Sequence, residues 1–286
     1  MSKIILTGSQ ALYGDIISFL PVLNYLEKLY PKSIKIWSLA KKCEQARSFL
    51  QNHHLIDGVR ISQPSEGLGQ EDIEYIDKKF DIVCRINPPI SEENWFNKYN
   101  LRQECFLMYG FGLGAYEQLS DEEKFPKLNQ WFSVEKQENY IAIWSSSGYV
   151  MDPANLKRNP SKEYWFRLVE RLVKEGYKIA QLGMVNHELI SDKVLDLRSL
   201  TLFDAIRFSL ECQCSIQTDS GSAHILGAYA ANQILLTTYW RDGHFQNPDG
   251  LIPVNYKNRA INMFCESGVN NIQYDKIAEG IKILNE

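Results

Sequence analysis

The sequence of 286 residues lacks long apolar runs, Cys-x-x-Cys pairs and any Asp-x-Asp motif. Its first apolar run, Ile4 to Leu6, is too short for the core of a signal peptide. The next run, Ile16 to Leu23, is interrupted by a serine and a proline, and no segment approaches the length that spans a bilayer. These absences predict a cytoplasmic protein without a targeting segment or membrane span.

The six cysteines do not have the spacing of a zinc site. In a reducing cytosol we expect buried thiols rather than disulfides. Cys212 and Cys214 are two positions apart, so both are expected on one side of a strand. No metal site is therefore predicted from the cysteines.

Basic charge is not in excess, because the net charge is −4 and the pI is about 5.8. This balance argues against a nucleic-acid partner. A local basic stretch does run from Lys28 to Arg47. It is either a solvated face, which we favour, or a contact for a phosphorylated glycolipid or the anionic inner face of a membrane.

Apolar strands alternate with amphipathic helices along most of the chain. Such alternation predicts an α/β fold with parallel sheets and helices on both faces. The strands are expected at 3–7, 34–37, 58–61, 81–84, 140–144, 178–182, 215–217 and 233–237, and the helices at 16–29, 41–50, 71–79, 162–175, 201–210, 220–231 and 275–284.

The charged stretch 120–138, which contains a proline, is the best candidate for a linker. We therefore predict two Rossmann-like domains, 1–136 and 137–286, and the C-terminal helix could return to the first domain. Tandem domains of this kind leave a cleft between them, and ligands bind beyond the carboxyl ends of the strands.

The strongest local feature is Thr218-Asp219-Ser220-Gly221-Ser222-Ala223-His224, between a predicted strand and helix. A helix start exposes unpaired N–H groups and the positive end of its dipole. Gly221 allows close approach of a ligand, and two serines add hydroxyl groups. Two interpretations stay open: a pyrophosphate site, or an ordinary N-cap followed by a buried histidine.

Two further turns carry groups that suit chemistry. Asp15 follows Gly14 at the start of the first helix, where it is either an N-cap or a carboxylate that accepts a proton from a sugar hydroxyl. Lys157 and Arg158 precede another helix, and a cation there either neutralises a departing phosphate or is merely solvated. The glycines at 110, 112 and 114 are expected to form a turn rather than a phosphate loop.

Taken together and in order, these features resemble the heptosyltransferases and their relatives, glycosyltransferase family 9, which have the GT-B fold. The departures are Asn159, where the family has tryptophan, and 238–244, which replaces a Gly-Pro-Thr turn. The matching motifs are Gly14-Asp15-Ile16-Ile17 with Leu20-Pro21 and Leu23, then Lys157-Arg158-Asn159-Pro160, and finally Asp196 to Leu202 followed by Thr218-Asp219-Ser220-Gly221 and His224.

The resemblance implies a role for each matched residue. Asp15 is the general base on the acceptor hydroxyl, and Lys157 stabilises the leaving diphosphate with help from Ser145 or Ser146. The donor's pyrophosphate and sugar are held by Asp219, Ser220, Gly221 and His224, while Gly183 and Glu188 line the nucleoside end. We expect Asp219 to contact sugar hydroxyls or cap the helix rather than touch phosphate.

The implied activity is inverting, metal-independent transfer of a sugar, heptose or similar, from a nucleotide-diphosphate donor to a glycan or glycolipid hydroxyl. The reaction builds negative charge on the diphosphate, and fixed donors can offset that charge in place of a metal. No cofactor is expected, and lipopolysaccharide or glycan biosynthesis is the implied context. The alternatives are a sugar-nucleotide epimerase of the same architecture and a non-catalytic sugar-nucleotide binding module.

Overall fold

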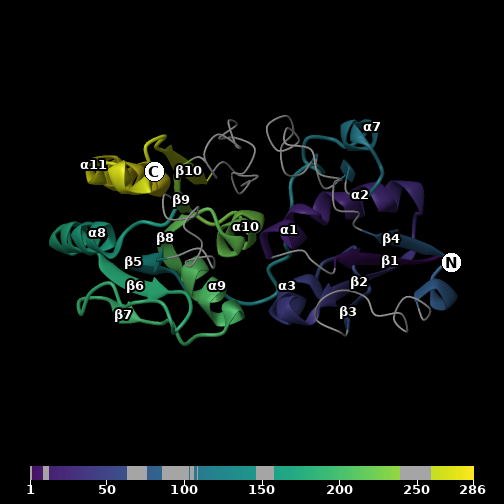
Figure 1. Ribbon diagram of the computed structural model, residues 1–286, viewed down its shortest axis with the longest axis horizontal. Helices are drawn as coiled ribbons and strands as arrows, with labels where there is room; N and C mark the ends of the chain where they lie inside the picture. Colours follow the sequence, from purple (N-terminus) through teal and green to yellow (C-terminus); the bar gives the residue numbers. More distant parts are fainter. Residues whose placement is uncertain are drawn as a thin grey trace. The chain divides into compact units, whose positions relative to one another are not determined.

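The computed structural model describes residues 2–8, 13–62, 76–85, 103, 106–107, 109–145, 158–238 and 259–286, with the backbone alone at 8, 13–15, 40–42, 62, 85 and 137–138. These residues form two compact units, one ending at Trp131 and the other beginning at Phe132. Each unit is built on its own parallel sheet (Figure 1). The expected α/β class with two parallel-sheet domains is confirmed, and the expected boundary between 136 and 137 stays a prediction.

The sheet of the first unit has the strand order β3-β2-β1-β4, with all neighbours parallel. Its strands coincide closely with the predicted ones, and the apolar run Ile4-Ile5-Leu6 of β1 is completely buried at the centre of the sheet. The strands are β1 (Lys3–Gly8), β2 (Ile34–Ala40), β3 (Gly58–Ser62) and β4 (Ile82–Arg85), and the helical segments are α1 (Tyr13–Ser18), α2 (Leu20–Leu29), η1 (Lys41–Ala46), α3 (Arg47–Leu50) and α7 (Leu113–Glu117).

The helix expected at 16–29 is two helices, α1 and α2, separated at Phe19. Pro21 occupies the first turn of α2, where its missing N–H costs nothing, whereas in a continuous helix its ring would collide with an earlier carbonyl. The backbone accommodates it with a tight turn, in which Val22 N donates to Phe19 O at 2.9 Å. The break lets buried residues of both helices cover the sheet.

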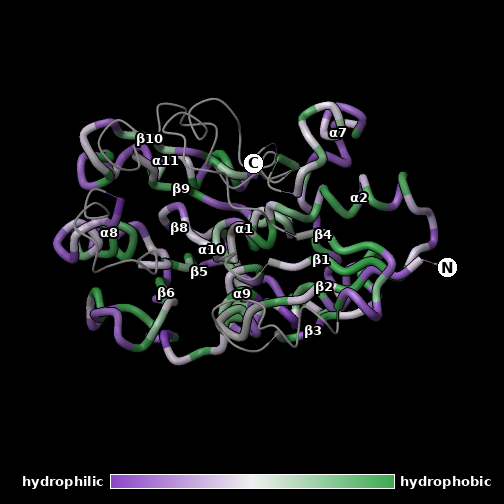
Figure 2. Tube along the Cα trace, turned by 45° about the vertical axis from the view of Figure 1, so that its right-hand side comes forward, coloured by the Kyte–Doolittle hydropathy of each residue, from purple (hydrophilic) through white to green (hydrophobic). Residues whose placement is uncertain are grey.

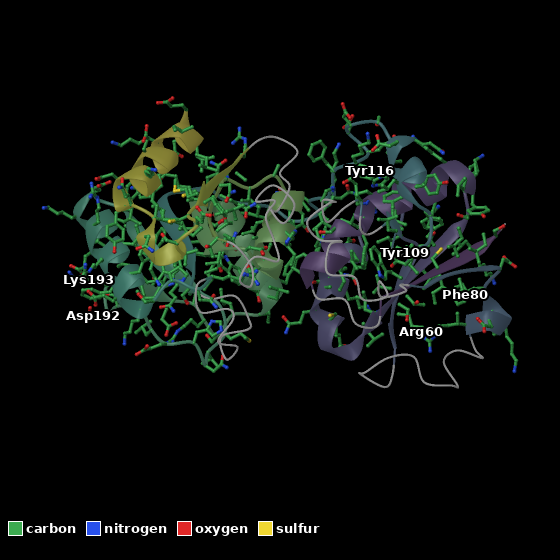
Figure 3. All side chains as sticks on the ribbon, turned by 45° about the horizontal axis from the view of Figure 1, so that its top comes forward. Arg60, Phe80, Tyr109, Tyr116, Asp192 and Lys193 are labelled. Carbon is green, nitrogen blue, oxygen red and sulfur yellow. The ribbon has the colours of Figure 1, made fainter. Side chains whose placement is uncertain are left out.

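Aromatic rings attach the segment around α7 to α2 in the same unit. Tyr109 lies edge-on to Phe19 with ring centroids 5.2 Å apart, and Phe106 lies edge-on to Tyr25 and Tyr116 at 5.8 and 5.5 Å. Figure 3 shows Tyr109 and Tyr116 among the side chains of this region. Such contacts stabilise a segment that contributes no strand.

The sheet of the second unit has six strands in the order β10-β9-β8-β5-β6-β7, again all parallel. Strands β7 and β10, which form its two edges, were not predicted. The elements are β5 (Gln137–Trp144), α8 (Lys162–Lys174), β6 (Lys178–Leu182), β7 (Leu195–Asp196), α9 (Leu202–Glu211), β8 (Cys212–Thr218), α10 (Gly221–Ala228), β9 (Gln233–Thr237), β10 (Ala260–Phe264), η3 (Val269–Asn271) and α11 (Tyr274–Asn285).

Helices cover both faces of this sheet. Side chains of α8 and α11, such as Trp165 and Ile281, pack with alternate residues of the strands, including Ile143 and Ile216. Along α8 the tube changes between hydrophilic and hydrophobic colours, as expected for a helix with one buried face (Figure 2). Helices α9 and α10 contact the strands and each other. The C-terminal helix thus packs on the sheet of its own unit.

Four cysteines in the described part of the chain are buried thiols, as predicted: Cys43, Cys84, Cys212 and Cys214. Burial raises the pKa of Cys84 to about 11 and that of Cys214 to about 12, so both are protonated at neutral pH. In the ranges given above, no helix has the length and apolar character needed to cross a membrane.

Candidate functional site

The turn that follows β8 leads directly into the N-terminus of α10. Ser220 is the N-cap of this helix, and its carbonyl accepts from Ala223 N at 3.1 Å and His224 N at 3.3 Å. Among the described residues, the N–H groups of Gly221 and Ser222 have no hydrogen-bond acceptor. Two donors at the positive end of the helix dipole are therefore available to an anion.

The hydroxyl of Ser220 does not cap α10. Its Oγ lies 2.8 Å from Ser222 Oγ, and Ser222 Oγ lies 2.8 Å from the side-chain amide of Gln217 on β8. Gln217 is completely buried, whereas Ser220 is partly exposed. The serine at the helix start is thus held from inside the unit, and its hydroxyl has no further partner within the described part of the chain.

Asp219 binds the side chains of Arg158 and His224 rather than capping the helix. Arg158 Nη2 donates to Asp219 Oδ2 at 2.6 Å, and His224 Nε2 lies 3.4 Å from Oδ1. Burial alone would raise the pKa of Asp219, but the hydrogen bond from His224 and the charge of Arg158 outweigh it and lower the pKa. The carboxylate is ionised, and both of its oxygens are already engaged.

Arg158 is the residue that the sequence interpretation passed over in favour of its neighbour. The side chains of Arg158 and Asp219 are 15% and 18% exposed, so the pair is largely shielded from water but still reachable. The bond brings a cation to the loop that precedes α10. The signal in the sequence was the pair Lys157-Arg158, from which only the lysine was selected; Lys157 itself lies outside the described residues.

A second group of expected site residues lies at the carboxyl ends of β5 and β6. Ser145 Oγ is 3.0 Å from Gln181 Nε2, and Gln181 also holds the next loop by donating to Glu188 O at 2.8 Å and accepting from Ile190 N at 2.8 Å. Ser145 is buried, so it positions this loop. Glu188 is an exposed residue of this loop, and its carboxylate pairs with Lys162, the first residue of α8.

Gly183 is required by the backbone at the end of β6. Its φ is +128°, and a Cβ there would lie 2.9 Å from His187 Nδ1. That nitrogen accepts from Met184 N at 3.3 Å, so glycine permits a tight turn. Burial, followed by the nearby charge of Arg198, lowers the pKa of His187.

The structure thus places the expected donor-binding residues of the second unit that it describes at the carboxyl ends of neighbouring strands. Strands β8, β5 and β6 are parallel neighbours, so the turn at Asp219 and the loop at Gly183 leave the same side of the sheet. Asp15 lies in the first turn of α1, but its side chain is outside the described part, as is all of Ser146. Across the described side chains, no cluster of three or more His, Cys, Asp or Glu residues could hold a metal ion.

No protein-family model matches the sequence, and a search of curated proteins finds no match. Solved structures do match it over nearly the whole chain. A glycosyltransferase of family 9 from Veillonella parvula has a TM-score of 0.69 at 14% identity, covering 99% of this chain and 97% of its own. The E. coli ADP-heptose lipopolysaccharide heptosyltransferase II has a TM-score of 0.70 at 13% identity, covering 99% and 98%.

The E. coli heptosyltransferase WaaC with ADP is a further match, with a TM-score of 0.63 at 12% identity and 99% of both chains covered. Each of the three alignments runs through both units of this chain. At this identity the likeness concerns architecture. The chain therefore has the GT-B fold of the family 9 glycosyltransferases.

Proposed function

We propose that the protein is an inverting, metal-independent glycosyltransferase that moves a sugar from a nucleotide-diphosphate donor to a hydroxyl of a glycan or glycolipid. One observation carries the proposal: the start of α10 presents the N–H groups of Gly221 and Ser222 with the Ser220 hydroxyl, and Asp219 holds Arg158 at the same turn. These are the groups that a diphosphate needs.

The donor's diphosphate occupies the start of α10 in this proposal. As the bond to the sugar breaks, negative charge grows on the phosphate oxygens, and the N–H groups with Arg158 offset it. Lys157, one residue before Arg158, adds a second cation, and Ser146 a hydroxyl. Because the N–H groups of α10 and the paired Arg158 are held in place before the reaction, they can replace the charge that a divalent metal supplies in other enzymes.

Asp219 has a positioning role in this proposal, and its own charge is offset by Arg158. A carboxylate at a phosphate site would repel the ligand, but Asp219 is paired with Arg158 and His224. Through these bonds it orients both side chains, and His224 with Asp219 can still face the sugar of the donor. Gly183, Ser145 and Glu188 belong to the region that receives the nucleoside, where Ser145 acts through Gln181.

Asp15 is proposed to take the proton of the acceptor hydroxyl, which then attacks the anomeric carbon and inverts its configuration. The donor is proposed to be a nucleoside diphosphate heptose or a similar sugar, since the solved structures of the same fold include an ADP-heptose transferase. The acceptor is a glycan or glycolipid, and reaching it at the inner face of the membrane involves peripheral contact. The protein acts in the cytoplasm.

The experiment is a transfer assay with ADP-heptose and candidate glycolipid acceptors, with and without EDTA. Turnover that survives EDTA and gives the inverted anomer is expected. Asp15→Ala should bind donor normally but transfer about 10²- to 10⁴-fold more slowly, as for loss of a general base. Asp121→Ala, which changes a fully exposed carboxylate, is the matched control. Full transfer by Asp15→Ala would remove the assigned base, and failure of every nucleotide sugar to bind would contradict the proposal.

A further inference from the structure

Two buried glutamines connect the core of the second unit to Ser220. Gln217 on β8 and Gln233 on β9 are both 0% exposed, and their side-chain amides lie 2.7 Å apart. We propose that they are positioning residues, which fix the direction of a hydrogen-bond chain so that the Ser220 hydroxyl donates toward the anion bound at the start of α10. This inference rests on the proposed function for the identity of that anion.

The direction is set where Gln233 meets the backbone of α10. One end of its amide lies 2.9 Å from Gly227 N and the other lies 3.2 Å from Ala223 O. A backbone N–H only donates and a backbone carbonyl only accepts, so Oε1 of Gln233 faces Gly227 and Nε2 faces Ala223. Because neither backbone group can exchange its role, the orientation of this amide is fixed.

The orientation of the Gln233 amide determines that of the Gln217 amide, because the two are in contact. The Nε2 of Gln233 also points at the amide of Gln217, and an amide nitrogen cannot accept a hydrogen bond. The end of Gln217 that faces Gln233 is therefore Oε1, which can also accept from Ser215 Oγ at 3.2 Å. Its other end, 2.8 Å from Ser222 Oγ, is then the donating Nε2.

The direction of the last two hydrogen bonds follows from the number of protons on the two serine hydroxyls. A serine hydroxyl has one proton and can accept as well. Ser222 Oγ accepts from Gln217, so its own proton is available for Ser220 Oγ at 2.8 Å. Ser220 Oγ accepts that proton and keeps its own for a ligand. With the opposite direction, Ser220 would donate inward and present lone pairs to a phosphate, which would weaken binding.

Burial makes this arrangement costly to reverse. Gln217, Gln233 and Ser222 are all buried, so water cannot readily replace a hydrogen bond that one of them loses. Turning one amide would leave a buried N–H facing an N–H, and a buried unsatisfied donor is strongly disfavoured. The hydroxyl of Ser220 is therefore preset before any ligand arrives, rather than reoriented on binding.

The test uses the full-length protein, ADP as the probe, and two independent readouts. By calorimetry, Ser220→Ala should weaken ADP binding about tenfold or more, as for loss of a hydrogen bond to a charged group. Ser222→Ala should weaken it about threefold to tenfold, and adding it to Ser220→Ala should cost nothing further, because both act through one hydroxyl. The control is Ser209→Ala, which removes a buried hydroxyl that donates to Ala205 O and accepts from Trp144 Nε1, outside this chain of hydrogen bonds; it should bind ADP normally.

The second readout is NMR of the unliganded protein with labelled glutamine. Nuclear Overhauser contacts should join the side-chain amide protons of Gln217 to the β-protons of Ser222. Contacts from those protons to Gln233 instead would overturn the proposal whether or not ADP binds. Additive effects of the two serine variants would overturn it too. Absence of ADP binding by the unaltered protein contradicts the proposed function, whereas the NMR result alone decides the orientation.

Discussion

Arg158 and Asp219 are joined by an ion pair of 2.6 Å across 61 positions of sequence, beside the first turn of α10. The pair brings a guanidinium to a helix start whose first two N–H groups have no acceptor among the residues that the structure describes. It also cancels the charge of the one carboxylate in that turn. Under the proposed function, this turn can therefore receive an anion although an acidic residue stands within its motif.

Replacing Asp219 by asparagine should lower the free energy of unfolding by about 2 kcal/mol at pH 7, because Arg158 would lose its ionised partner in a shielded position. The pKa of Asp219 in the folded state lies below its ordinary value of 3.8. Its contribution is thus present above pH 3.8 and lost as the pH falls through the folded-state pKa.

Urea denaturation from pH 7 to pH 3 would measure this difference, which should be constant above pH 5 and shrink in acid. Asp192→Asn, which changes an exposed carboxylate labelled in Figure 3, is the control and should be nearly neutral. A variant of Asp219 as stable as the original protein at pH 7 would contradict the assigned ion pair.

Gly183→Ala should destabilise the loop after β6 by about 1–3 kcal/mol, because alanine is strained at a φ of +128° and its Cβ meets His187. Under the proposed function it should also weaken ADP binding. The matched control is Gly176→Ala. The φ of Gly176 is also positive, at +96°, but nothing lies within 4 Å of an added Cβ, and the residue precedes the amino end of β6. Equal effects of both variants on ADP affinity would argue against a role for the loop.

Much of the fold could be predicted because several central strands contain a run of apolar residues. Strands such as β1, with Ile4-Ile5-Leu6, and β9, with Ile234-Leu235-Leu236, are buried in the sheet interior, so their composition alone indicates them. The edge strands β7 and β10 pair on one side and are partly or fully exposed, and a mixed pattern such as that of 260–264 carries little signal. The break between α1 and α2 was missed although Pro21 indicates it.

The candidate site was chosen from the turn at 218–224, but the contacts of its residues depend on tertiary structure. The motif at 218–224 follows a strand and opens a helix, which the local pattern is enough to predict. Nothing local indicates that Arg158 meets Asp219, or that three glutamines, 181, 217 and 233, are buried with every amide group engaged. Glutamine is ordinarily a surface residue, so its burial emerges only once the strands are paired.

His53 should make the stability of the first unit depend on pH between 6.5 and 4. Burial, and then the charge of His54, lower the pKa of His53 to about 4. The unfolded chain therefore binds a proton that the folded chain does not, and stability falls by about 3 kcal/mol as the pH drops through this window. Hydrogen exchange of β2 and β3 amides would report the loss.

His53→Asn keeps an acceptor for Leu55 N, which bonds to Nδ1 at 3.2 Å, and should flatten the pH dependence. His54→Asn changes the exposed ring stacked on His53, with centroids 4.7 Å apart, and should retain most of it. Loss of the pH dependence in the second variant alone would show that the exposed histidine is responsible.

Glu123 fastens the charged segment after α7 to α2. Its Oε2 accepts from Lys28 Nζ at 2.7 Å and from Ser120 N at 2.8 Å, and these bonds lower its pKa to about 2. Glu123→Gln should lose about 1 kcal/mol at pH 7, a modest value because the side chain is one-third exposed. The loss should fade as the pH falls from 4.5 through 2, since the original carboxylate is then protonated.

The check is thermal unfolding of both proteins across that pH range, with Glu122→Gln as the control. Glu122 is 81% exposed and pairs with Lys127, so its replacement should have little effect at any pH. If both variants lost the same free energy of unfolding at pH 7, the hydrogen bond from Ser120 N to Glu123 would make no contribution to stability.

The common direction of the strands also separates two kinds of turn within the second unit. Loops that leave the carboxyl ends of β5, β6 and β8 carry the candidate ligand groups, whereas the exposed turn at Gly176 enters β6 from the other end. A fluorescent dye or affinity tag attached at Gly176 would leave the ligand groups untouched. Because the candidate ligand groups lie on these loops, substitutions in the loops can change ligand specificity while the strands and the core stay the same.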